Sequence, residues 1–121
     1  MDSCGTSGRN LVRLPNADRA LVDIAKLRSY CLNSHHPEGR HKARVFMAAL
    51  DLGSADAEEL RDALLAAART REAVAGEADE YGRRFWVDFT MHRGDREANV
   101  RSSWIIRRGE DCPRLTSCYV L

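Results

Sequence analysis

Residues 83–108, RRFWVDFTMHRGDREANVRSSWIIRR, contain two runs of alternating apolar and polar side chains that decide the fold. The first run predicts a strand over 83–92, and Gly94-Asp95 supplies the turn into a second strand over 98–108. The apolar face carries Phe85, Val87, Phe89, Met91, Val100, Trp104 and Ile106. The opposite face carries Trp86, Asp88, Thr90, His92, Arg101, Ser103, Ile105 and Arg107. Such one-sided strands are typical of an antiparallel sheet with one covered face.

Three helices are expected before this hairpin. Asp23 is the predicted N-cap of a helix through about residue 32, and Ser54 caps a longer helix over 54–70. Between them, residues 39–50 also have helical spacing. The buried stripes of the last two helices are Ala43, Phe46, Met47 and Leu50, and Leu60, Ala63, Leu64 and Ala67.

The segments after the helices complete the predicted sheet. An irregular strand over 72–80 precedes the hairpin, and LTSCYVL (115–121) follows it as the last strand. We therefore predict an α+β domain over 14–121, in which about three N-terminal helices cover one face of a four-stranded antiparallel sheet. Residues 1–13, which lack periodicity, are expected to be a disordered or loosely ordered leader.

Composition limits the classes of function. The formal charge of the 121 residues is only +1, which excludes the bulk electrostatics of a nucleic-acid coat protein. The four cysteines, Cys4, Cys31, Cys112 and Cys118, form no C-x-x-C pair, and no apolar run reaches membrane length. We expect free thiols, a cytoplasmic location without membrane contact, and neither an organic cofactor nor a bound metal.

The polar residues suit metal-independent RNA cleavage, which needs a base, an acid and cations around the phosphorane. His41 is a candidate base or acid, and Thr116 or Ser117 is a candidate ligand of a phosphate oxygen. The candidate cations are Lys42, Arg44 and Arg101, and the candidate base-stacking rings are Trp86, Trp104 and Tyr119. Each has a structural alternative: an exposed His41, a Lys42 whose stem packs on the core, a surface ion pair for Arg44, and tryptophans that pack in the sheet.

A resemblance to a known family adds weight to this chemistry. The segments LPNADRALVDIAKLRSYCLN (14–33), HHPEGRHKARVF (35–46), EADEYG (77–82) and SSWIIRRGEDCPRLTSCYVL (102–121) resemble a family of small bacterial proteins of unknown function. More remotely, the order of helices then sheet, the G-x-x-K-A-x-x-F pattern and a final R-L-x-(S/T)-x-Y strand are similar to ribonuclease toxins of the barnase, EndoU, colicin and RelE types. The toxin resemblance implies a site made of His41, Lys42, Arg114, Thr116 and Tyr119, with Ser117 as an alternative hydroxyl.

Two functional hypotheses follow. The first is an endoribonuclease of toxin type that cleaves tRNA or mRNA and is inhibited by a cognate antitoxin or immunity protein, with Arg44, Arg101 and Trp86 binding the RNA. The second is a non-catalytic interaction module, an accessory or antitoxin-like domain whose open sheet face or edge binds a partner protein. The first requires the start of the second helix to lie within hydrogen-bond reach of the last two strands.

Overall fold

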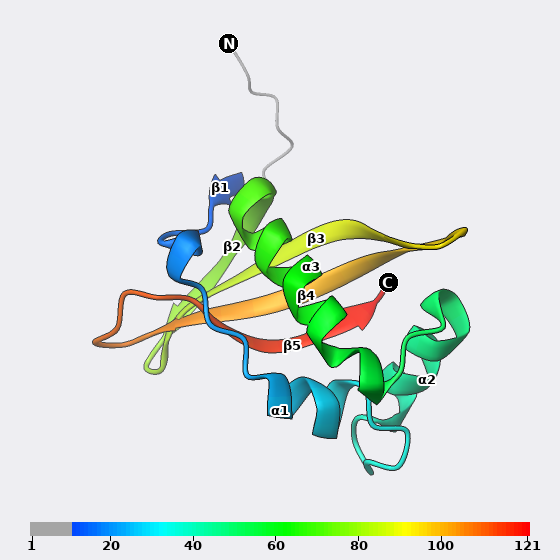
Figure 1. Ribbon diagram of the computed structural model, residues 1–121. Coiled ribbons are helices and arrows are strands. Elements are labelled where there is room, and N and C mark those ends of the chain that lie inside the picture. The colour runs from blue at the N-terminus through cyan, green and yellow to red at the C-terminus, as the bar shows by residue number, and fades with distance from the viewer. Residues whose placement is uncertain (1–10) are drawn as a thin grey trace.

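Five strands form one antiparallel sheet in a computed structural model that describes residues 11–121 (Figure 1). They are β1 (Leu11–Arg13), β2 (Glu72–Asp79), β3 (Gly82–Arg93), β4 (Arg96–Arg107) and β5 (Arg114–Val120). Each strand pairs with the next one along the chain. The α+β class and the antiparallel meander are therefore confirmed, but the sheet has five strands where four were predicted.

The additional strand, β1, lies in the segment assigned to the leader. It pairs with β2, and the Arg13 guanidinium donates hydrogen bonds to the main-chain carbonyls of Arg69 (3.0 Å) and Thr70 (3.3 Å). A three-residue strand is too short to show a period of two, so sequence patterning does not detect it. Residues 1–10, the rest of the predicted leader, lie outside the described residues.

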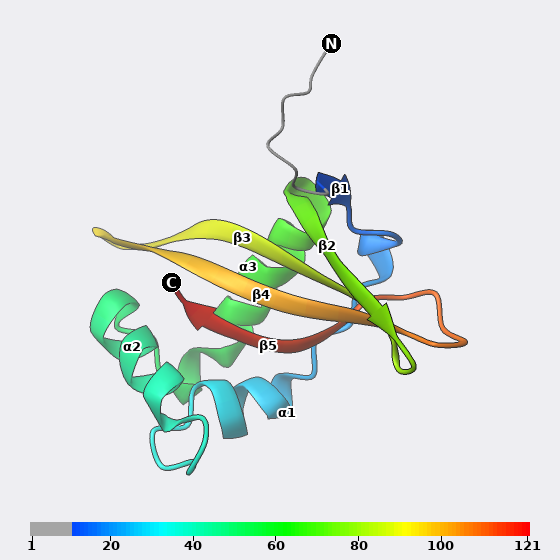
Figure 2. The same cartoon turned by 180° about the vertical axis from the view of Figure 1, so that it is seen from behind.

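Three helical segments pack against the sheet: the longest crosses one face, the other two lie along one edge, and Figure 2 shows the opposite face without a helix over it. The first is α1 (Ile24–Lys26), which continues into the π-helical turn η3 (Leu27–Cys31). The others are α2 (Arg40–Leu50) and α3 (Ala57–Thr70), and short 3₁₀ turns occupy η2 (Ala17–Arg19) and η4 (Ser54–Asp56). α2 packs beside the β5 edge of the sheet.

The helix starts agree only in part with the sequence. Asp23 is the N-cap of α1, as predicted, and its carboxylate accepts the N–H of Ala25 at 3.0 Å. The prediction for Ser54 was wrong, because a 3₁₀ turn intervenes before α3. In that turn the Asp56 carboxylate accepts the N–H of Gly53 at 3.0 Å. The side chain that caps the 3₁₀ turn therefore belongs to its last residue and not to Ser54.

The core lies between the helices and the covered face of the sheet. Ala43, Phe46 and Leu50 of α2 are buried, as are Leu60, Leu64 and Ala67 of α3. Met47, predicted to be buried, is 48% exposed. Because α2 packs at the edge of the sheet and not over its centre, its apolar contact is narrower than a full helical stripe.

Trp104 belongs to this core and not to the open face. It is 1% exposed, its indole N–H donates to the Ser102 hydroxyl at 2.9 Å, and that hydroxyl donates to the Val87 carbonyl at 2.8 Å. Burial thus excludes the role of Trp104 as a base-stacking ring. The chain of hydrogen bonds satisfies the polar groups of the buried pair.

A bulge between β4 and β5 determines which side chains of β5 reach the open face. Trp104 pairs with Leu115 and Ser103 with Ser117, so Thr116 is the extra residue. Beyond the bulge, Tyr119 lies opposite Arg101. Without the extra residue the alternation would place Tyr119 on the same face as Leu115, which is buried.

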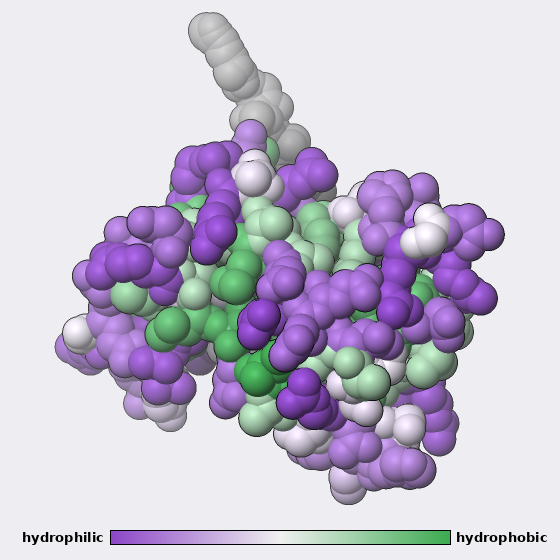
Figure 3. Space-filling model, in the orientation of Figure 1, coloured by the Kyte–Doolittle hydropathy of each residue, from purple (hydrophilic) through white to green (hydrophobic). Residues whose placement is uncertain are grey.

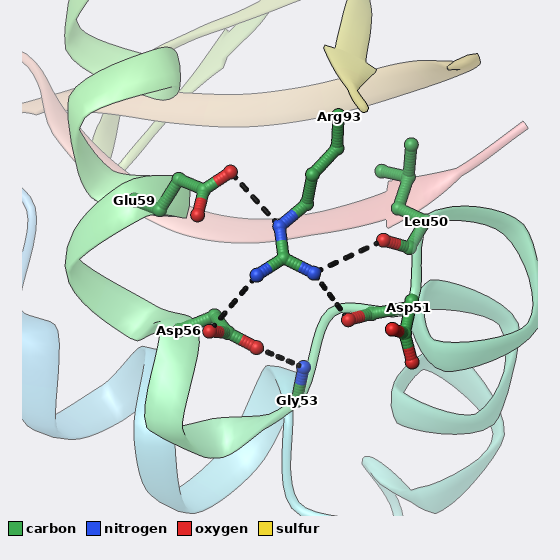
Figure 4. Close-up of polar contacts among 6 residues, drawn as sticks. All are labelled: Leu50, Asp51, Gly53, Asp56, Glu59 and Arg93. Carbon is green, nitrogen blue, oxygen red and sulfur yellow. Dashed lines mark hydrogen bonds and ion pairs between the residues drawn. The ribbon is translucent and has the colours of Figure 1, made fainter. Parts of the chain in front are cut away.

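Arg93, at the end of β3, ties the sheet to the connection between α2 and α3 (Figure 4). Its guanidinium pairs with Glu59 (2.9 Å) and Asp56 (3.0 Å) and donates to the carbonyls of Leu50 (3.2 Å) and Asp51. Asp51 ends α2 in the left-handed conformation, with φ of 54°. The carbonyls left unpaired at the end of α2 thus receive hydrogen bonds from a cation.

The helix-covered side of the molecule is mostly hydrophilic, with apolar residues gathered beside α3 (Figure 3). None of the helices in the described part of the chain has the length and the apolar character needed to cross a membrane.

Candidate functional site

Lys42 joins the start of α2 to the last strand. It lies in the first turn of the helix, and its ammonium group donates to the Ser117 hydroxyl at 3.0 Å. These two residues are 75 positions apart in the chain. The requirement stated above, that the second helix and the last strands meet within hydrogen-bond distance, is therefore satisfied.

Two tyrosine rings flank the same ammonium group. The Lys42 nitrogen lies 5.2 Å from the ring centroid of Tyr30 in η3 and 5.8 Å from that of Tyr119 in β5. Both distances are within the range of cation–π attraction. Lys42 is thus held between one hydroxyl and two aromatic rings, which restrict where its charge can lie.

The loop before α2 explains the glycine of the G-x-x-K-A-x-x-F pattern. A Cβ atom on Gly39 would lie 2.1 Å from the Tyr30 carbonyl oxygen, so no other residue fits without moving the backbone. His36 Nδ1 accepts the N–H of Gly39 at 3.0 Å, and the His36 ring meets Tyr30 edge to face at 4.7 Å. This close packing brings Tyr30 and Lys42 together.

Arg101 is the second cation of the site, on β4 opposite Tyr119. Its Nε and Nη2 atoms each bind one oxygen of Asp88 at 2.8 Å, and its guanidinium carbon lies 5.8 Å from the Trp86 ring centroid. The hydrogen bond with Asp88 raises the pKa of Arg101 above its ordinary value, and Tyr119 contributes in the same direction. The two-point pairing fixes the guanidinium plane.

Two hollows adjoin these cations. One, of ≈ 460 Å³, lies on the open face and is lined by residues that include Glu77, Trp86, Ser103, Thr116 and Ser117. The other, of ≈ 250 Å³, is lined by His41, Lys42, Val45, Tyr119 and Val120. Ser117 and Lys42, which bind each other, thus line neighbouring hollows. We call Lys42, Arg101, Ser117 and Tyr119, with Tyr30, Asp88 and Trp86 around them, the Lys42 cluster.

Most of the predicted site residues lie in or beside this cluster. His41 and Tyr119 line one hollow with Lys42, and Thr116 lines the other, where its hydroxyl donates to the Ser103 carbonyl at 3.1 Å. The structure gives the contact with Lys42 to Ser117 and not to Thr116.

Arg114 and Arg44 do not join the cluster. The Arg114 guanidinium binds both carboxylate oxygens of Glu110, at 2.9 and 3.2 Å, and lines a separate hollow with Lys26 and Arg107. Arg44 borders another hollow, beside Met47 on α2. Arg101, predicted as a candidate cation and as an RNA-binding residue, takes the place beside Tyr119.

Sequence reasoning missed Tyr30 and Asp88 as parts of the site. Asp88 was placed on the open face, and its pairing with Arg101 follows from the β3–β4 register. The position of the Gly94-Asp95 turn between the two alternating runs limits which residues of the two strands can pair. Tyr30 has no such signal, because its position depends on how the loop before α2 folds back.

The charges at the start of α2 oppose the helix dipole. The cations Arg40 and Lys42 occupy its first turn, which has no acidic residue. A cation at a helix N-terminus is unfavourable, by about 0.3–1 kcal/mol each at exposed positions. This concentration of positive charge beside Arg101 favours a negatively charged ligand.

Metal ligands do not gather anywhere in residues 11–121: no group of three or more His, Cys, Asp or Glu side chains could hold an ion there.

The family assignment covers nearly the whole chain. Residues 13–121 match the domain of unknown function DUF6883, and the protein belongs to this family. Comparison with curated proteins and with solved structures gives no match.

Proposed function

We propose that this protein is a metal-independent endoribonuclease of bacterial toxin type, acting on tRNA or mRNA through the Lys42 cluster. The observation that carries the proposal is the 3.0 Å contact between Lys42 and Ser117, which unites a helix-borne cation with the hydroxyls of the last strand beside Arg101. Two cations, several hydroxyl donors and a half-buried tryptophan around neighbouring hollows suit a phosphodiester and an unpaired base.

The proposed reaction is attack of the ribose 2′-hydroxyl on the adjacent phosphorus, with departure of the 5′-oxygen. Lys42 and the guanidinium of Arg101 stabilise the charge that develops on the phosphorane oxygens. Ser117 orients one of these oxygens by hydrogen bonding, and Thr116 lines the same hollow. His41, which lines the adjoining hollow, carries the proton to or from the reacting oxygens. Trp86 supports a base at the edge of the open face.

The direct test is incubation of purified protein with tRNA and with mRNA, in buffer containing EDTA. Lys42→Ala should strongly reduce cleavage, whereas Lys26→Ala should not, since Lys26 is the only other lysine and lies outside the cluster. Expression of the wild-type protein should arrest growth, and Lys42→Ala should relieve the arrest. Intact RNA and normal growth with the wild-type protein would contradict the proposal.

A non-catalytic interaction module is the second candidate. It is supported by the exposed apolar residues at the end of the sheet, Val45 on α2 (44% exposed) and Leu121 (58% exposed), close to an apolar hollow. Recovery of a stoichiometric protein partner, with all RNA left intact, would favour this function over the first.

A further inference from the structure

Two buried cysteines lie directly behind the Lys42 cluster. Cys31, at the end of η3, is 1% exposed, and Cys118, in β5, is 0% exposed; both belong to the main hydrophobic core. η3 packs against β5, and both thiols are free in the structure. The function proposed above does not use either thiol.

The chain neighbours of these cysteines are the residues that hold Lys42. Tyr30, which precedes Cys31, lies 5.2 Å from the Lys42 nitrogen. Ser117 and Tyr119 lie on either side of Cys118 in the chain. The Lys42 nitrogen is 3.0 Å from the Ser117 hydroxyl oxygen and 5.8 Å from the Tyr119 ring centroid. Every named contact of the Lys42 ammonium group is therefore one residue away from one of the two thiols.

The thiols also affect each other's ionisation. A hydrogen bond with Cys118 lowers the pKa of Cys31 to about 6, against the effect of burial, and Lys42 lowers it further. The same hydrogen bond and burial raise the pKa of Cys118 well above its ordinary value. One thiolate beside one thiol is the combination that reacts with an oxidant and then closes a disulfide.

We propose that Cys31 and Cys118 form a redox-sensitive dithiol, that hydrogen peroxide converts it to a disulfide, and that this modification controls the position of Lys42. The Cys31 thiolate attacks one peroxide oxygen, the O–O bond breaks, and the hydroxide that leaves takes a proton to become water. Cys118 then attacks the sulfenic sulfur of Cys31, an S–S bond forms, the S–OH bond breaks, and a second water leaves. Two thiols are oxidised and one peroxide is reduced to two waters.

The small oxidant reaches the pair during local opening of η3, a five-residue π-helical turn between a three-residue helix and a loop. A disulfide would then draw η3 and β5 into a new fixed spacing, because its geometry tolerates little variation. Tyr30 and Ser117 would move with it, and Lys42 would lose its present contacts. The effect on RNA rests on the proposed function, whereas formation of the disulfide does not.

The test uses the full chain with Cys4→Ser and Cys112→Ser, which leaves only the two cysteines of interest. The folded protein is treated with hydrogen peroxide, quenched with catalase, alkylated in denaturant and digested with trypsin, while circular dichroism verifies that the fold persists. The expected product joins peptides 29–40 and 115–121, with loss of two hydrogen atoms, and dithiothreitol reverses it. Two fully alkylated cysteines, sulfinic acid without a linkage, or a linkage found only after unfolding would each overturn the dithiol.

The position of Lys42 is read by acetylation of its amine relative to Lys26, the only other lysine. The ratio of Lys42 to Lys26 labelling should rise on oxidation, and it should not rise in the same protein carrying Cys31→Ala. An unchanged ratio in the disulfide form would overturn the control of Lys42. RNA cleavage should fall on oxidation and return with dithiothreitol. Intact RNA with the reduced protein would instead contradict the proposed function, while the mapped disulfide and the labelling shift would still support the switch.

Discussion

A cation lies at each end of α2, and the surroundings of the two cations differ. At its C-terminal end, Arg93 is surrounded by two carboxylates and two main-chain carbonyls (Figure 4). At its N-terminal end, Lys42 is held by a hydroxyl and two rings, with no ion pair between it and any carboxylate in residues 11–121. A compensated charge stabilises the fold, whereas an uncompensated one remains able to bind an anion.

The largest effect on function is expected from Lys42→Ala. Loss of one preorganised cation at a developing charge typically lowers the rate by roughly 10²–10³-fold, so RNA cleavage should fall by that order. The free energy of unfolding should change less than on removal of Arg93, because Lys42 loses one hydrogen bond and two cation–π contacts but no ion pair within residues 11–121. Single-turnover cleavage and urea denaturation measure the two quantities. If the variant cleaved RNA normally, or lost activity only because it unfolds, Lys42 would not be the functional cation that distinguishes this end of α2 from the Arg93 end.

Arg93→Ala should have the reverse profile. Removal of the guanidinium leaves Asp56 and Glu59 without their cation and the carbonyls at the end of α2 without a donor. We expect a clear decrease in the urea midpoint of unfolding, with cleavage retained below that midpoint. Arg96→Ala is the matched control, because within residues 11–121 the Arg96 guanidinium makes a single hydrogen bond, to the Ala48 carbonyl at 3.0 Å. Equal destabilisation by both substitutions would show that the ion pairs of Arg93 add no stability beyond that of a single hydrogen bond.

Asp88→Asn should affect the Lys42 cluster through Arg101. The amide cannot accept both guanidinium bonds, so the guanidinium plane is no longer fixed. Cleavage should fall roughly tenfold, the order expected for one lost charge-assisted hydrogen bond. The substitution should affect kcat more than KM, because the Arg101 guanidinium loses its fixed orientation but keeps its positive charge. Asp95→Asn, in the exposed β3–β4 turn, should leave both parameters unchanged and controls for the loss of a negative charge.

The smallest effect is expected from Arg40→Glu, in the first turn of α2. Replacing a cation by an anion there should stabilise the protein by about 0.3–1 kcal/mol, because an acidic side chain favours the N-terminal end of the dipole. RNA binding at low salt should weaken at the same time. Arg44→Glu makes the same charge change outside the first turn and should stabilise less. If both variants gained equal stability, the dipole would not be the cause.

Local patterning was sufficient for most of the fold. The alternation in 83–92 and 98–108 predicted two strands and their covered face, and both were confirmed, since a period of two is written into consecutive residues. The helical stripes were confirmed except that Ala63 is only partly buried and that Met47 is exposed, where the width of the contact depends on what α2 packs against. β1 escaped detection because three residues show no period.

The candidate site divides in the same way. Lys42 and Tyr119 could be named from the sequence because their types suit the chemistry and a resemblance supported them. The sequence could not show whether Arg101 or Arg114 belongs to the site, since both are strand arginines. The structure distinguishes them because Arg114 pairs with Glu110. The choice between Thr116 and Ser117 also stayed open.

By itself, therefore, the sequence determined the order of helices and strands and the face of each central strand that is buried. The tertiary structure alone decided that Lys42 meets Ser117, Tyr30 and Tyr119. The physical reason is the β4–β5 bulge, which changes the alternation of β5 by one residue and so places Ser117 and Tyr119 on the open face and Cys118 in the core. A bulge depends on the pairing of two strands, and no local pattern within LTSCYVL contains it.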